Sequence, residues 1–97
     1  VYIQGIKKMN RRVHILIKGK VQGVFFRAAI AEKAKALKMK GWVKNNGDDV
    51  EVLLEGKDEA IKEMLEFCIL GPKGAKVTAM NIDELPYEGE YKEFIQE

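Results

Sequence analysis

The segment KGKVQGVFFRAAI, residues 18–30, places an arginine four residues after a glycine, at the start of an apolar run. A helix N-terminus has unpaired N–H groups and partial positive charge, so a glycine-bearing loop leading into one can surround a phosphate group with donors. Helical side chains lean toward the N-terminus, so the Arg27 guanidinium can swing back over that loop and pair with phosphate oxygens. A plain strand-to-helix turn with Arg27 as a surface charge explains the same residues, and the residues alone favour this interpretation.

A second group with chemical potential is the pair Asn45 and Asn46 in GWVKNNGD. An asparagine side chain has a carbonyl acceptor and an amide donor, which suit it to orienting a water molecule. Asn-Gly between two strand-like runs is also a strong hairpin signal. Taken alone, the residues favour hairpin roles for both asparagines, with Asn46 in the turn beside Gly47.

The chain has one cysteine and one histidine, which excludes an internal disulfide and a metal site built from several such residues. Cys68 lies on an apolar stripe, and the arginine that a cysteine-phosphatase loop needs six residues later is Gly74 here. We therefore predict core packing for Cys68 and a hydrogen-bonded place in a strand for His14. Trp42, with its large ring, is also predicted to lie in the core. The segment GKVQGVFF lacks the G-K-[ST] of nucleotide-binding loops, and neither a metal nor a cofactor is expected.

Strand and helix patterns alternate along the chain. Residues 13–18 alternate apolar and polar side chains in a β-branched run, which predicts a strand. Apolar residues follow helical spacing from Phe26 to Leu37, and Gly41 is a typical stop signal, which predicts a helix to about Lys40. The other predicted elements are strands at 41–45 and 49–56, a helix at 57–70, a strand at 76–85 and a short edge strand at 91–97.

This β-α-β-β-α-β order predicts the α+β class and a ferredoxin-like βαββαβ fold, an α/β sandwich in which an antiparallel sheet carries two helices on one face. The length of 97 residues, 46% of them hydrophobic, fits a single core. We expect residues 1–12 to form an N-terminal tail and residues 13–97 to form the domain. Because this fold hosts many functions, the function has to come from the site.

The net charge is only +2, but the charges are unevenly distributed. Residues 1–31 contain seven basic residues and no acidic one, so an anionic partner is expected to approach the first third of the chain. Solvated tail residues account for four of the seven equally well. No run approaches the roughly 18 apolar residues of a membrane span, and the N-terminus lacks a secretory h-region. We expect a cytoplasmic monomer with no membrane partner.

Two linked motifs resemble the acylphosphatase family. KGKVQGVFFR resembles the family signature G-x-V-Q-G-V-x-F-R, and GWVKN, which follows it, resembles the second signature, G-[WY]-V-x-N. The resemblance extends through VEVLLEG, the helix that ends in Gly-Pro, the AKVT strand and the terminal Phe94 and Ile95. It therefore covers residues 13–97.

The resemblance implies hydrolysis of the carboxyl–phosphate bond of acyl phosphates, without metal or cofactor. It implies that Arg27 binds the phosphate and that Asn45 positions the attacking water. Inorganic phosphate would be both a product and a competitive inhibitor. The family's phosphate cradle falls on the backbone of Lys20, Val21, Gln22, Gly23 and Val24.

Such a site needs no catalytic histidine, cysteine or carboxylate pair. A carboxylate is a good leaving group, so no strong general acid is required, and N–H groups with one arginine can hold the charge on the phosphoryl oxygens. The hairpin NNGDDVEV is one residue shorter than in many family members. A register shift of one residue would exchange the faces on which Asn45 and Asn46 lie.

Two other functions fit the same scaffold. A single-stranded RNA-binding module would use the basic first third, but such modules stack bases on aromatic residues of their first and third strands. The corresponding runs here are VHILIK and DVEVLLE, which offer no such platform, so no nucleic-acid partner is expected. The other alternative is a catalytically silent or specialised relative, such as the acylphosphatase-like domain that begins a hydrogenase maturation factor.

Overall fold

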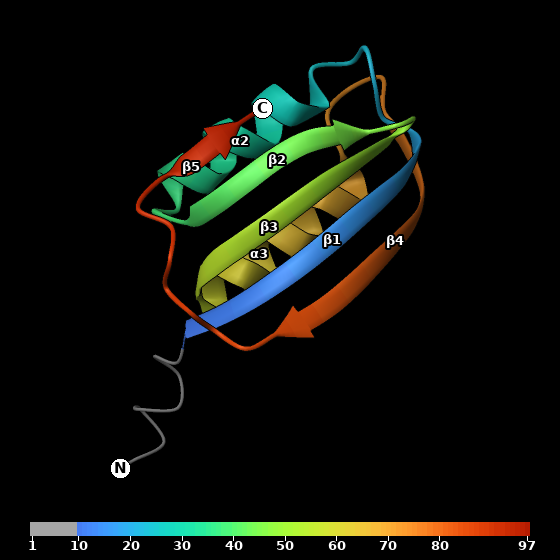
Figure 1. Cartoon of the computed structure of the whole chain (residues 1–97). Helices are drawn as coiled ribbons and strands as arrows, with labels where there is room; N and C mark the ends of the chain where they lie inside the picture. The colour runs from blue at the N-terminus through green and yellow to red at the C-terminus, as the bar shows by residue number, and fades with distance from the viewer. Residues whose placement is uncertain (1–9) are drawn as a thin grey trace.

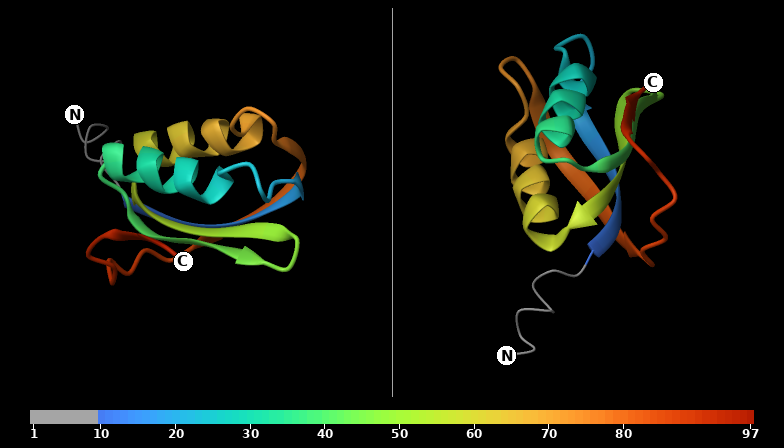
Figure 2. Two further views of the ribbon diagram at one scale, coloured as in Figure 1. Left: turned by 90° about the horizontal axis from the view of Figure 1, so that it is seen from above. Right: turned by 90° about the vertical axis from the view of Figure 1, so that its left-hand side faces the viewer.

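The computed structural model describes residues 10–97, in which a five-stranded sheet carries two helices on one face (Figures 1 and 2). This arrangement confirms the predicted ferredoxin-like α+β fold. The elements are, in chain order, β1 (Asn10–Lys20), α2 (Phe26–Ala36), β2 (Lys40–Asn46), β3 (Asp49–Lys57), α3 (Asp58–Leu70), β4 (Lys76–Leu85) and β5 (Phe94–Gln96).

The strands lie in the order β4-β1-β3-β2-β5. Four of them pair antiparallel as predicted, but β5 pairs parallel to β2, so the expectation of a wholly antiparallel sheet is wrong at this edge. The reason is the direction in which the chain returns. β4 ends at the end of the sheet where β2 begins. At this end the segment 86–93 crosses from the β4 edge to the opposite edge, so β5 starts beside the start of β2 and runs in the same direction.

The core lies between the sheet and the helices. In β1 the alternation of side chains buries Val13, Ile15 and Ile17 completely, as predicted. β3 adds Val50, Val52 and Leu54, and Cys68 of α3 is also fully buried, which confirms its predicted core position. Each large apolar side chain removed from water stabilises the fold by about 1.5 to 3 kcal/mol.

Trp42 is not in this core, which corrects our prediction. Its neighbours Gly41 and Val43 are buried on the helix side, so alternation along β2 turns the indole toward the open face of the sheet. There Trp42 is half-buried, and its indole N–H donates to the hydroxyl of Tyr91 at 3.2 Å.

The first helix ends earlier than predicted, at Ala36 instead of about Lys40. The N–H of Met39 donates to the carbonyl of Ala34 (2.8 Å), and the N–H of Lys38 donates to Lys35 (3.0 Å). These are the two hydrogen bonds of a Schellman motif. Lys38 has the left-handed φ of 59° that such a motif requires, so the chain leaves the helix there and buries Met39.

β1 is longer than predicted and directs the chain into the next loop. It begins at Asn10, so residues 10–12, which we assigned to the tail, belong to the sheet, while residues 1–9 lie outside the described residues. The pairing of β1 with β4 shifts register between Lys18 and Gly19. A Cβ on Gly19 would lie 2.1 Å from the carbonyl oxygen of Lys76, and the φ of Gly19 is 130°. Only glycine fits at this bend, after which residues 21–25 lead into α2.

Candidate active site

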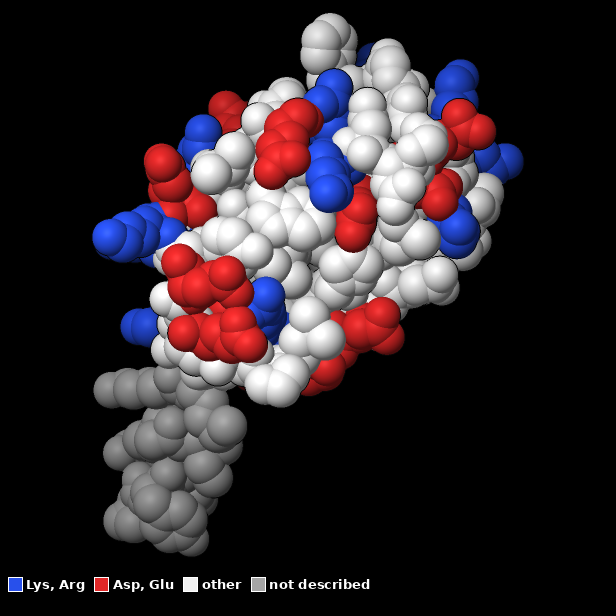
Figure 3. Space-filling view, in the orientation of Figure 1, with Lys and Arg blue, Asp and Glu red and all other residues white. Residues whose placement is uncertain are grey.

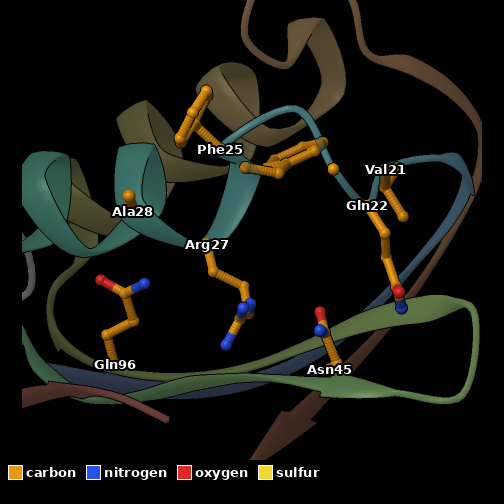
Figure 4. Close-up of a pocket in the computed structure, with 9 residues that line it drawn as sticks. Val21, Gln22, Phe25, Arg27, Ala28, Asn45 and Gln96 are labelled. Carbon is orange, nitrogen blue, oxygen red and sulfur yellow. The ribbon is translucent and has the colours of Figure 1, made fainter.

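A pocket of about 330 Å³ opens where the 21–25 loop, the start of α2, the end of β2 and the chain end at β5 come together (Figure 4). The segments that form it are far apart in the sequence but adjacent in the fold, because β2 lies between β3 and β5 at this edge of the sheet. The pocket is lined by Val21, Gln22, Gly23, Phe25, Phe26, Arg27, Ala28, Asn45 and Gln96.

The loop has the backbone pattern of an anion-binding cradle. Gly23 and Phe25 have positive φ angles of 73° and 60°, while Val24 between them does not. Left-handed residues in a turn can point neighbouring N–H groups into one concavity, which attracts anions. A left-handed phenylalanine costs of order 1 kcal/mol, and Phe25 is 85% exposed, so packing of its side chain does not explain the strain.

The N-terminus of α2 also faces this region with its donors free of a side-chain cap. Phe25 occupies the N-cap position without a side-chain hydrogen bond to the helix, and the first turn contains no acidic residue. The partial positive charge of the helix end is therefore not neutralised from within this turn.

Arg27 is the second residue of α2, and its side chain extends from the helix across the pocket toward the sheet (Figure 4). Its Nη1 donates to the main-chain oxygen of Glu97. No aspartate or glutamate side chain is among the residues that line the pocket, so the guanidinium N–H groups not bonded to Glu97 can donate to an anionic ligand.

Asn45 extends into the same pocket from the opposite side, near Arg27 (Figure 4). It pairs with Val50 of β3, which is buried under the helices, and cross-strand partners share a face. Asn46 pairs with Asp49 and lies on the open face, where its Nδ2 donates to Glu51 Oε1 at 3.3 Å. Asn46 is thus the last residue of β2, and not part of the turn as we predicted.

The turn itself consists of Gly47 and Asp48. Gly47 has a φ of 62° and Asp48 does not have a positive φ, which are the signs of a type II′ turn with glycine at its first position. Gln22 from the loop reaches this hairpin: its Nε2 donates to the carbonyls of Gly47 and of Asp49, the latter at 3.2 Å.

The structure brings most of the predicted site residues together. Arg27, Asn45 and the loop residues 21–23 all line the pocket. Lys20 and Val24 do not: Lys20 is the exposed last residue of β1, and Val24 packs against the edge of the core. The pocket residues absent from our prediction are Phe25, Phe26, Ala28 and Gln96. Phe25 and Phe26 belong to the first motif and Ala28 follows it directly, whereas Gln96 comes from β5 and carries no local signal.

Two basic residues of the first third, Arg11 and Arg12, are held in ion pairs with carboxylates and do not offer a free charge to an anionic partner. Arg12 is paired with Glu88 and Glu90 at 2.6 and 3.0 Å, and Arg11 is paired with Glu84 at 2.6 Å. The hydrogen bond from Arg11 holds the pKa of Glu84 below its usual value. Figure 3 shows the open face, on which acidic and basic side chains are interspersed. Arg27 is thus the basic residue of this third that lies in the pocket.

The other candidate residues lie outside the pocket. His14 is hydrogen-bonded in the sheet as predicted, with its Nε2 2.7 Å from Glu51 Oε2. Burial raises the pKa of the Cys68 thiol to about 12. Within residues 10–97, no three His, Cys, Asp or Glu side chains are grouped so as to hold a metal ion. Neither of the two described helices is long and apolar enough to cross a membrane.

Comparisons with known proteins agree on one family. The family model described as Acylphosphatase matches residues 13–95. An acylphosphatase of Aeropyrum pernix is 41% identical over 85 residues, which span 86% of this chain and 84% of the relative. The structure of an acylphosphatase from Coxiella burnetii matches with a TM-score of 0.85 and 37% identity, over 91% of this chain and 93% of that one. Full-length HypF in its phosphate- and nucleotide-bound form matches with a TM-score of 0.83 and 27% identity, over 92% of this chain but 12% of that one.

Proposed function

Since this chain belongs to the acylphosphatase family and is an acylphosphatase hydrolase, we propose that the pocket between α2 and β2 is its active site. In this proposal the loop and Arg27 bind the phosphoryl group of an acyl phosphate, and Asn45 positions the water that attacks it. The observation that carries the proposal is the convergence of Arg27, Asn45 and the left-handed loop on one pocket.

The loop and Arg27 act on the charge of the phosphoryl group. As the P–O bond breaks, negative charge is spread over the phosphoryl oxygens, and fixed donors aimed at them stabilise the transition state. The N–H groups of residues 21–26 and the guanidinium of Arg27 are such donors, and their positions are set by the fold before the substrate binds. A single charged donor of this kind contributes about 3 to 4 kcal/mol, or more.

Asn45 acts on the nucleophile. Its amide faces the pocket from β2, so the phosphoryl group held at the loop lies between the asparagine and the helix end. A water molecule that donates a hydrogen bond to the side-chain amide oxygen of Asn45 keeps a lone pair free, with which it can attack phosphorus in line with the leaving oxygen. The P–O bond to the water forms, the P–O bond to the carboxylate breaks, and the water proton passes to a phosphoryl oxygen.

The leaving group explains why no acid is needed in the pocket. The products are a carboxylate, which is stable without protonation near neutral pH, and inorganic phosphate. Inorganic phosphate presents the same oxygens to the same donors, so it competes with the substrate in this proposal. The monomeric state and the cytoplasmic location remain predictions.

The function is tested by a release assay with a simple acyl phosphate beside a phosphate monoester. The acyl phosphate is expected to be hydrolysed and the monoester, whose alkoxide is a poor leaving group, is expected to remain. Hydrolysis of neither compound by the folded protein would favour the catalytically silent alternative. Comparable hydrolysis of both would show that the pocket supplies acid catalysis, which the proposed residues do not.

A further inference from the structure

The side chain of Gln22 joins the two halves of the pocket. Its Nε2 donates to the carbonyl of Gly47 and to that of Asp49. These two carbonyls flank Asp48 in the turn, so one amide group is bonded to both sides of the hairpin tip. In Figure 4 the Gln22 side chain extends from the loop down to the hairpin that carries Asn45.

The sheet does not hold this hairpin tip against the loop. Backbone pairing between β1 and β3 ends at Ile17 and Val50, so the backbone of residues 46–49 is not paired with β1, and its sheet pairing is that between Asn46 of β2 and Asp49 of β3. Asn45 is the β2 partner of Val50, so it lies where the pairing of β3 with β1 ends. Among the hydrogen bonds of residues 10–97, the two from Gln22 are the ones that connect residues 21–27 with residues 45–49.

We propose that Gln22 is a positioning residue, whose side-chain amide fixes the phosphate loop against the β2–β3 hairpin and thereby sets the distance from the bound phosphoryl group to Asn45. The proposal rests on the proposed function of Arg27 and Asn45. It gives Gln22 a side-chain role distinct from its backbone place in the cradle. Because in-line attack depends on the position of the water, a displacement of about 1 Å can cost up to about 100-fold in rate.

The test is Gln22→Met, which keeps the length and the neutral charge of the side chain but removes the amide donor. We expect kcat for an acyl phosphate to fall about 10- to 100-fold. The inhibition constant of inorganic phosphate should change less than about threefold, because the loop backbone and Arg27 are intact. A merely structural role would lower the melting temperature and leave kcat of the folded protein unchanged.

Lys18→Met is the matched control. Lys18 Nζ is 2.9 Å from Asp49 Oδ2 on the open face of the sheet. Like Gln22→Met, this variant therefore removes a contact to Asp49 of the β2–β3 hairpin, but on the face away from the pocket. Because this exposed ion pair does not reach the pocket, kcat should remain within about twofold of the parent value. A loss of kcat in Lys18→Met as large as that in Gln22→Met would overturn the specific role of the Gln22 amide.

A double-mutant cycle with Asn45→Ala identifies the residue through which Gln22 acts. If Gln22 only positions Asn45, Gln22→Met should lower kcat less than about twofold once Asn45 is already absent. The inference would be overturned, with the proposed function intact, if Gln22→Met lowered kcat by the same factor in the parent and in Asn45→Ala. A loss of phosphate affinity that matches the loss of kcat would overturn it in the same way. An Asn45→Ala protein with normal kcat would overturn the proposed function and this link with it.

Gln22→Asn provides a second variant if Gln22→Met does not fold. The side chain of asparagine is one methylene shorter, so its amide should no longer reach the two hairpin carbonyls, while a polar side chain is kept at this half-buried position. The same loss of kcat with unchanged phosphate inhibition is expected, and full activity of Gln22→Asn would contradict the proposal.

Discussion

The side chains of Asn45 and Asn46 lie on opposite faces of the sheet, although the two residues are neighbours in β2. Asn45 lines the pocket that contains Arg27, whereas Asn46 donates to Glu51 on the open face. The partners across the hairpin, Val50 for Asn45 and Asp49 for Asn46, fix this register. A shift of one residue would exchange the two side chains, so the register of this hairpin decides which asparagine can act on the substrate.

We predict that Asn45→Ala and Asn46→Ala differ in kind. Asn45→Ala should lower kcat by about 100-fold or more with little change in phosphate affinity, because the residue acts on the attacking water. Asn46→Ala should keep turnover and cost less than about 1 kcal/mol of stability, since it loses one exposed hydrogen bond to Glu51. Steady-state kinetics and thermal melts on both variants decide this. A collapse of kcat confined to Asn46→Ala would show that Asn46, and not Asn45, positions the attacking water.

The fold and the first part of the site were predictable because they depend on local patterns. Alternation in β1 identifies the buried face, and the same alternation in β2 places Asn45 with buried Val43. All residues of the segment 21–27 except Val24 line one pocket, because a loop leading into a helix N-terminus turns its donors to one side.

The errors have physical causes that local patterns do not contain. α2 ends in a Schellman motif with Lys38 at the position that glycine usually occupies, so no glycine marks its end. Gln96 enters the pocket through the parallel pairing of β5 with β2, a contact between distant parts of the chain. The Gln22 bonds to the hairpin depend on the same kind of long-range register. Trp42 was misplaced by residue type, although its alternation with Val43 indicates the open face.

The rate should not depend on a divalent metal ion. Arg27 and the loop N–H groups supply at the phosphoryl oxygens the positive charge that a magnesium ion provides in other phosphoryl-transfer enzymes. Initial rates should therefore be equal before and after dialysis against a chelator. A loss of activity that returns on addition of magnesium would contradict the proposed site.

Inorganic phosphate should inhibit competitively. It offers the same oxygens to the same loop and to Arg27, so it should raise the apparent KM and leave kcat unchanged. Initial rates at several phosphate concentrations, with sulfate at matched ionic strength beside them, test this. Inhibition that lowers kcat with no effect on KM would place the anion site elsewhere.

The buried thiol of Cys68 should make stability fall at alkaline pH. Burial raises the pKa of this thiol to about 12, whereas in the unfolded chain it ionises near its usual value of 9.0. The unfolded state therefore loses a proton first, and stability contributed by the thiol declines as the pH rises from about 9 toward 12, with a limiting slope of about 1.4 kcal/mol per pH unit. Denaturant unfolding of the parent and of Cys68→Ala should show a shallower decline for the variant over this range. Parallel declines would indicate that the thiol is not protected, and activity near neutral pH should be the same in both proteins.

The central claim is that the charge of Arg27 stabilises the phosphoryl transition state, and kcat/KM of Arg27→Ala for a simple acyl phosphate tests it most directly. The loss of one charged donor should cost about 3 to 4 kcal/mol or more, which reduces activity by roughly 150-fold or more. Lys35→Ala, which removes an equal charge from the exposed last turn of α2, is the control and should keep full activity. Far-UV circular dichroism and a thermal melt establish that both variants are folded. Near-normal turnover in a folded Arg27→Ala protein would contradict the proposed active site.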